Sequence, residues 1–346
     1  MAVLRSSSLA LVLLLAGCDR GGGDRDAGPS AAVDRAAIEA ALRSAQRLLD
    51  ERRVDEAVLV AGTLASRAPD SWEAAELHAR TLVASSFELA GRGREAESSQ
   101  RHALAAAEYR RAAELAQCAA IWHAAGIAAA VAGERGAAIE SFRRAAAADP
   151  ESAQAPIYEA QVHLGAGDLD AAEEALRRAA ALQPEEPFVL ATQAELARAR
   201  GDMERAFSLI RAARRRGGAE LSFRVVEARF LRQSQRPREA IELLAALGPA
   251  VIEHESATDE LAHSWIALGE PRRAAELWGA FQLAHPPRWR SGLRAAEAWI
   301  AAGDAVRADL ALREVELRVG AHPEAVALRE RLVGAAPTGA DPRDAR

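Results

Sequence analysis

The sequence predicts an all-α protein, an α-α superhelix in which helix-turn-helix repeats stack into a solenoid. The main observation is a run of six alanines spaced 34 residues apart: Ala138, Ala172, Ala206, Ala240, Ala274 and Ala308. A second small residue lies twelve positions before each alanine, and a bulky apolar residue lies four positions after it. A period of 34 residues is typical of repeats that each contain two helices and a turn.

The aligned positions have a physical explanation. Small residues allow two helices to cross closely, while bulky residues fill the spaces between crossings. The second small position is occupied by Gly126, Ala160, Ala194, Ala228, Ala262 and Ala296, and the bulky position by Phe142, Leu176, Ile210, Leu244, Trp278 and Leu312. Five positions before each alanine lies a turn residue, which is glycine in all repeats except one. Glycine there permits the left-handed backbone that ends the first helix of a repeat.

These motifs resemble a known repeat family. The segment 119–152 carries Trp122, Gly126, Ala138, Phe142, Ala145 and Pro150, and so resembles the tetratricopeptide repeat. Further copies, with weaker aromatic and proline positions, are the segments 153–186, 187–220, 221–254, 255–288 and 289–322. The alternative is a generic alanine-rich helical bundle without a repeat architecture. The resemblance implies a solenoid that binds another protein or a peptide.

The first 17 residues have the pattern of a bacterial lipoprotein signal peptide. A basic residue, Arg5, precedes a short apolar run that is too short to span a bilayer as a stable helix. The run ends in Leu15-Ala16-Gly17-Cys18, which resembles a lipobox. The resemblance implies cleavage before Cys18 and lipidation of that residue, with acyl chains such as palmitate holding the protein on a membrane. An unlipidated secretory signal or an anchoring helix is the alternative.

The remaining chain divides into three segments. Residues 18–33, rich in Gly, Asp and Ser, are expected to form a flexible linker after the lipidated cysteine. Residues 34–334 are expected to form about eight repeats, closed by a short helix over 323–333, and residues 335–346 a disordered tail. In the second repeat we place Ala96 at the conserved alanine position. This repeat is longer than the others, and residues 94–117 are expected to form one long helix.

The long helix 94–117 has two interpretations. Its beginning is polar, from Ser98 to His102, where a packing residue is expected. A long polar helix can serve as a docking feature for a partner. The simpler interpretation is an insertion that the solenoid tolerates.

Composition and motifs argue against catalysis and nucleic-acid binding. The net charge of −6 is the opposite of the basic balance that a general nucleic-acid binder usually has. His254-Glu255 begins like a zinc-protease helix, but Thr258 stands where the second histidine would be needed. We therefore expect no enzyme activity, no metal and no cofactor. The predicted function is a membrane-tethered protein-protein interaction scaffold of the bacterial cell envelope, on its periplasmic or outer face. The alternative is a structural accessory subunit of an envelope enzyme or transport complex.

The partner-binding residues are inferred from the family resemblance. In this family the first helix of each repeat lines a concave groove. Reading the groove positions in this sequence gives a candidate set: Phe188, Glu195, Arg198, Val225, Arg229, Arg232 and His263. Three guanidinium groups against one carboxylate favour an acidic segment of a partner, with Phe188 and Val225 supplying apolar contact. The simpler alternative is that Glu195 pairs with an arginine and the other groups are solvated.

Overall fold

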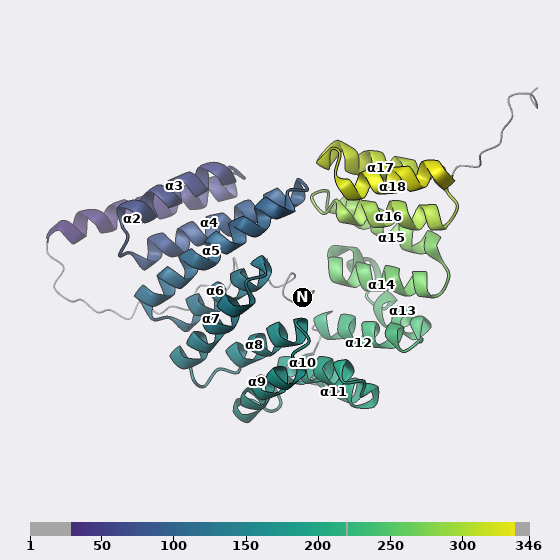
Figure 1. Ribbon diagram of the computed structural model, residues 1–346, viewed down its shortest axis with the longest axis horizontal. Helices are drawn as coiled ribbons and strands as arrows, with labels where there is room; N and C mark the ends of the chain where they lie inside the picture. Colours follow the sequence, from purple (N-terminus) through teal and green to yellow (C-terminus); the bar gives the residue numbers. More distant parts are fainter. Residues whose placement is uncertain (1–28, 219–220, 336–346) are drawn as a thin grey trace, which may run out of the picture. The chain divides into compact units, whose positions relative to one another are not determined.

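The computed structural model describes residues 29–218 and 221–335. Every regular element within these ranges is helical, which confirms the all-α fold class (Figure 1). The chain divides into two compact units, which are described separately. The first runs to Gly217 apart from Gly91–Gly93, and the second comprises those three residues and the chain from Gly218 onward.

Unit 1 consists of helix pairs in which a first helix and a second helix pack against each other. The pairs are α2 (Pro29–Asp50) with α3 (Val54–Arg67), α4 (Trp72–Gly91) with α5 (Glu95–Ala116), α6 (Ala119–Ala132) with α7 (Arg135–Ala148), α8 (Gln154–Gly165) with α9 (Leu169–Leu182), and α10 (Pro187–Ala199) with α11 (Met203–Arg216). Successive pairs also contact each other, as α5 does with α6 and α7 with α8. The pairs therefore stack in chain order within this unit.

Unit 2 continues the same pattern. It contains the pairs α12 (Leu221–Gln233) with α13 (Pro237–Ala245), α14 (Glu255–Ala267) with α15 (Pro271–Ala284), and α16 (Arg290–Ala301) with α17 (Ala305–Val319). A short 3₁₀ helix, η1 (Gly248–Glu253), connects the first two pairs. The last helix, α18 (Pro323–Ala335), packs on α16 and α17, as expected for an element that covers the end of a stack.

The predicted repeat positions are confirmed. All six alanines of the 34-residue series are 0% exposed, and the six bulky residues that follow them are between 0 and 4% exposed. The turn residues all have positive φ, from 61° at Gln235 to 88° at Gly133. Gln235 shows that the left-handed turn is required by the architecture even where the sequence does not supply a glycine. Each repeat is therefore a close helix crossing followed by a left-handed turn, as the sequence period indicates.

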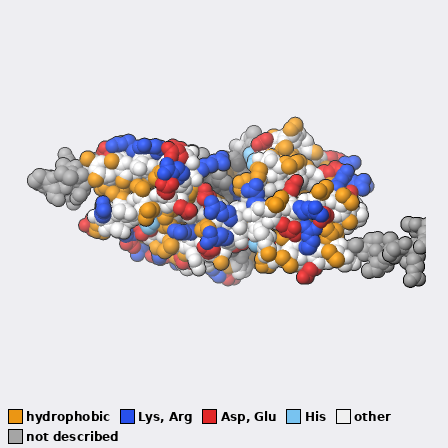
Figure 2. Space-filling view, turned by 90° about the horizontal axis from the view of Figure 1, so that it is seen from above, with side chains coloured by type: hydrophobic (Ala, Val, Ile, Leu, Met, Phe, Trp, Pro, Cys, Tyr) orange, Lys and Arg blue, Asp and Glu red, His pale blue; other side chains and the backbone are white. Residues whose placement is uncertain are grey.

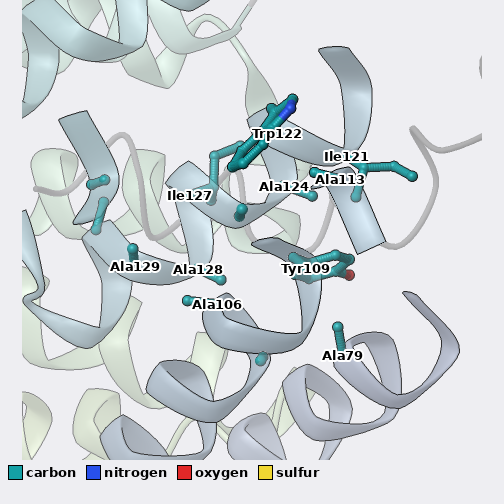
Figure 3. Packing of buried hydrophobic residues seen from close by; sticks show 14 of the residues in the cluster. Ala79, Ala106, Tyr109, Ala113, Ile121, Trp122, Ala124, Ile127, Ala128 and Ala129 are labelled. Atoms are coloured by element: carbon teal, nitrogen blue, oxygen red, sulfur yellow. The ribbon is translucent and has the colours of Figure 1, made fainter. Parts of the chain in front are cut away.

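One crossing is especially tight. A Cβ atom placed on Gly126 of α6 would lie 2.6 Å from the Phe142 ring of α7, closer than real Cβ contacts come. The same helix contributes Ile121 and Trp122 to a buried cluster that also contains Tyr109 of α5 (Figure 3). Alanines fill most of the remaining cluster, so its helices approach each other closely. This packing makes the α4–α7 region the largest core of unit 1.

The second repeat has a different register from the predicted one. The residue in the buried alanine position is Ser98, which follows the left-handed turn at Gly93 by five residues, whereas Ala96 is exposed. Counting from Ser98, the equivalent small position is Ser86 and the bulky position is His102, and both are buried. Placing Ala96 at the conserved position was therefore wrong by two residues. The search for alanine missed a repeat whose packing positions are all polar.

The polar packing residues of this repeat contact each other. Ser86 Oγ on α4 lies 3.2 Å from His102 Nε2 on α5, and His102 Nδ1 lies 3.1 Å from the Ser98 carbonyl oxygen. Burial lowers the pKa of His102, which favours the neutral ring. The helix 94–117 does form one long element, as predicted, but its beginning packs against the equally extended α4. The insertion interpretation fits Ser98 and His102 better than an exposed docking surface does.

The ends of the chain are described only in part. The helix α2 begins at Pro29, so residues 29–33 of the predicted linker are helical. The signal peptide, the lipidation residue Cys18, the rest of the linker and the tail from residue 336 lie outside the described residues. Among the helices that the structure does describe, none combines the length and the apolar character needed to cross a membrane.

Candidate interaction surface

The predicted partner-binding residues fall in both units. Phe188, Glu195 and Arg198 lie on α10 of unit 1, whereas Val225, Arg229 and Arg232 on α12 and His263 on α14 belong to unit 2. All of them lie on the first helices of their pairs. The structure therefore groups the seven residues into two local sets.

In unit 1, the α10 residues combine one apolar side chain with an ion pair. Proline at the first helical position and the Glu186 carboxylate, which accepts a hydrogen bond from the Phe188 amide at 2.9 Å, fix the start of the helix. The Phe188 side chain, two residues after this cap, is 40% exposed. One and two turns along α10, Glu195 accepts a hydrogen bond from Arg198 Nε at 2.9 Å. Pairing of Glu195 with an arginine was the simpler alternative, and the structure shows that pairing.

The neighbouring helix α8 contributes a polar position beside α10. Gln161 Nε2 lies 3.5 Å from Thr192 Oγ1, and the Thr192 hydroxyl donates to the Phe188 carbonyl at 2.8 Å. The other amide atom, Gln161 Oε1, is buried without a hydrogen-bond partner among the described residues. The surface formed by α8 and α10 therefore offers an acceptor close to an exposed aromatic ring.

In unit 2, two of the predicted arginines share a carboxylate that the sequence analysis missed. Arg232 Nε donates to Glu260 at 2.5 Å, and Arg229 Nε lies 3.7 Å from the same carboxylate. Glu260, on α14, is only 6% exposed. Its carboxylate reduces the excess of positive charge expected at this position. The position next to it, Asp259, had been assigned to the groove, so the missed carboxylate was one residue away.

Two other predicted residues have settled surroundings. Val225 is 3% exposed, so it packs inside the unit and cannot supply the apolar contact expected of it. His263 is exposed, with Nδ1 2.7 Å from the Asp259 carbonyl oxygen and its ring against Trp278 at a centroid distance of 5.2 Å. Of the unit 2 set, His263 is therefore the residue most available to a partner.

The sequence analysis also missed a surface hollow at the start of unit 1. It has a volume of about 400 Å³ and lies between α2 and α4, and its lining is Leu42, Arg43, Gln46, Arg47, Asp50, Leu77 and Arg80. Gln46 joins the two helices, because it accepts from Arg80 Nη2 at 3.3 Å and donates to Asp50 at 3.0 Å. The residues that form it are separated by 34 positions and more in sequence, so only the stacking of repeats brings them together.

Charges elsewhere are mixed and largely paired. Figure 2 shows acidic and basic side chains interspersed over the visible face. A buried example is Glu159 of α8, which is 2% exposed and accepts from Arg143 at 2.9 Å and from Arg178 at 2.7 Å. These arginines come from α7 and α9, so the carboxylate connects three successive helices. The arrangement fits a structural role in holding repeats together.

The described residues show little that resembles a catalytic centre. Burial lowers the pKa of His123 to about 4, a shift that Asp149 partly opposes, and burial also lowers the pKa of His163. His123 is enclosed by the aromatic rings of Phe142 and Tyr158 and lacks a hydrogen-bond partner at Nε2. No group of three or more potential metal ligands occurs in residues 29–218 and 221–335. The geometry of this chain is that of a binding surface on a packed helical framework.

Comparisons with known proteins support the fold. No family model matches the sequence, and no curated protein matches it. The structure of yeast Tom70 has a TM-score of 0.61 and 14% sequence identity, covering 82% of this chain and 58% of that protein. The Cut9 complex of the APC/C has a TM-score of 0.48 and 16% identity, covering 85% of this chain and 55% of that one. A tetratricopeptide repeat protein from Parabacteroides merdae has a TM-score of 0.49 and 13% identity, covering 74% of this chain and 98% of that one.

These similarities concern architecture. The fold is a tetratricopeptide-repeat-like solenoid of stacked helix pairs, as the 34-residue period predicts. Its structural neighbours are tetratricopeptide repeat proteins, a class whose fold serves as a scaffold for protein-protein interaction. This chain spans little more than half the length of the first two matched structures.

Proposed function

We propose that the protein is a membrane-tethered interaction scaffold of the bacterial cell envelope, which binds a protein or peptide on the first helices of its repeats. The observation that carries this proposal is the stack of helix pairs itself, because repeats of this kind create extended surfaces suited to polypeptide partners. Phe188 on α10 and His263 on α14 are exposed on such helices. The net charge of −6 favours a protein partner over nucleic acid.

The membrane tether in this proposal rests on the sequence Leu15-Ala16-Gly17-Cys18. Several acyl chains on one residue would hold the protein firmly, because each buried CH₂ group contributes about 0.8 kcal/mol. With the linker that follows, the repeats would stand close to the membrane on the periplasmic or outer face. A partner would then be an envelope protein within reach of that surface.

The tether is tested by replacing Cys18 with serine. Only a thiol can form the thioether that carries the lipid, so Cys18→Ser is expected to abolish incorporation of a fatty-acid analogue in labelled cells and to reduce the membrane-bound fraction. The matched control is Cys118→Ser, which changes the same residue type at the start of α6. Equal labelling of the wild type and Cys18→Ser would refute the lipid anchor.

The binding surface is tested by photo-crosslinking in cells. A crosslinking amino acid at Phe188 or His263 is expected to capture a partner, because both side chains are exposed on first helices. The same amino acid at Leu59 of α3 and Leu317 of α17, which are 71% and 89% exposed on second helices, is the matched control. Adducts confined to the second-helix positions would reject the proposed surface. A single stoichiometric partner at all four positions would support the accessory-subunit alternative.

A further inference from the structure

The strongest unassigned feature is the hollow between α2 and α4. Its lining contains three guanidinium groups, from Arg43, Arg47 and Arg80, but only one carboxylate, from Asp50. That carboxylate already accepts a hydrogen bond from Gln46. The hollow is therefore a place where positive charge exceeds negative charge in a protein that is acidic overall.

The three arginines differ in how their charges are satisfied. Arg47 makes no ion pair or hydrogen bond with any described residue. Arg43 pairs loosely with Glu39, at 3.7 Å and with both side chains mostly exposed, an arrangement that contributes little. Arg80 donates through Nη2 to Gln46, and Glu76, one turn earlier on α4, lies within electrostatic range of it. The lining can thus accept further negative charge.

Arg80 also indicates the direction from which a ligand arrives. Its Nε atom is buried and has no hydrogen-bond partner in the described chain. An unpaired buried donor is costly, and a carboxylate is the acceptor whose geometry suits a guanidinium fork. Leu42 and Leu77 supply an apolar surface in the same hollow, and Leu77 is otherwise buried. The site therefore combines charged and apolar recognition.

We propose that this hollow binds an acidic peptide segment of the partner, with a carboxylate on Arg80 and Arg47 and an apolar side chain against Leu42 and Leu77. The proposal rests on the proposed function and adds the chemistry and the position of one contact. A peptide fits better than an anionic membrane surface. A flat surface would reach the exposed Arg43 and Arg47, but not the buried Nε of Arg80.

The test uses the full-length chain in detergent and a fluorescein-labelled peptide in which glutamate, aspartate and leucine alternate. The control peptide has lysine in place of the acidic residues. We expect the acidic peptide to bind at low salt, and the double variant Arg47→Gln/Arg80→Gln to weaken binding at least about tenfold, because two charge-assisted contacts are lost. The single variant Arg47→Gln changes an exposed side chain, so it tests the site even if Arg80 affects folding.

The matched control is Arg67→Gln, which removes the same charge from an exposed position at the end of α3. It should bind the acidic peptide as the wild type does. Equal binding by the double variant, no binding by the wild type, or binding of the lysine peptide would overturn the inference. So would arginine-dependent binding to phosphatidylglycerol vesicles without peptide binding.

Failure of this inference is distinguishable from failure of the proposed function. If photo-crosslinking at Phe188 or His263 captures a partner while the acidic peptide does not bind, the scaffold function stands and the hollow is not its acidic contact. If neither first-helix position captures a partner, the proposed surface fails whatever the peptide does.

Discussion

Replacing Phe142 with alanine is expected to lower the free energy of unfolding by about 3–5 kcal/mol, the largest effect of any single substitution considered for this chain. Phe142 is 0% exposed, and its ring stacks on Tyr158 at a centroid distance of 5.5 Å. The backbone of Gly126 approaches the same ring so closely that the two helices cannot move together to fill the space. Both the apolar contact and the volume would be lost.

Chemical denaturation monitored by circular dichroism would measure this effect. The matched control is Phe188→Ala, which removes the same ring from a position that is 40% exposed and should cost much less. If both variants were destabilised equally, the packing of the third repeat described above would be incorrect.

The second large effect concerns pH. The pKa of His123 is about 4 in the folded chain against 6.5 in the unfolded chain, because burial disfavours the charged ring. Between these two values the unfolded state binds more protons, so the free energy of unfolding falls as the pH falls. The total loss from this residue is about 3 kcal/mol, and it is complete near pH 4, where both states are protonated. Burial also lowers the pKa of His102 and His163, which gives the same sign.

The variant His123→Phe is expected to remove this part of the pH dependence. The aromatic edge contacts with Phe142 and Tyr158 can be retained, and no hydrogen bond at Nε2 is lost. Stability at pH 7 should change little, whereas the advantage of the variant over the wild type should grow as the pH is lowered to 4. Urea titrations at several pH values would show this, and parallel curves for the two proteins would contradict it.

The fold could be predicted because its main signal is a rigid period. A shift of one residue would place Ala206 or Leu176 on the wrong side of a helix, so the spacing had to be kept in each repeat. The second repeat escaped because the search depended on alanine. Gly93 and His102 stand at the correct offsets from Ser98, and searching for the left-handed turn instead of the small residue would have found them.

The candidate surface was less predictable, because it depends on how side chains of neighbouring helices meet. The groove positions indicated Arg229 and Arg232 but not Glu260, which pairs with Arg232 across 28 residues of sequence. They indicated Val225 as a contact residue, although that side chain is buried. The hollow around Arg47 and Arg80 has no sequence signature, since it exists only when α2 and α4 lie side by side.

The polar packing of the second repeat has a consequence for how the helices find their correct partners during folding. Five or more pairs built from alanine and one bulky residue resemble each other closely, so an incorrect pairing would bury similar surfaces. The contact between Ser86 and His102 is available only when α4 pairs with α5. If α4 paired instead with α7, Ser86 would face Phe142 and a buried hydroxyl would lack this partner. One hydrogen-bonded pair in an alanine core therefore marks the register of the whole first unit, much as a buried polar residue fixes the alignment of a coiled coil.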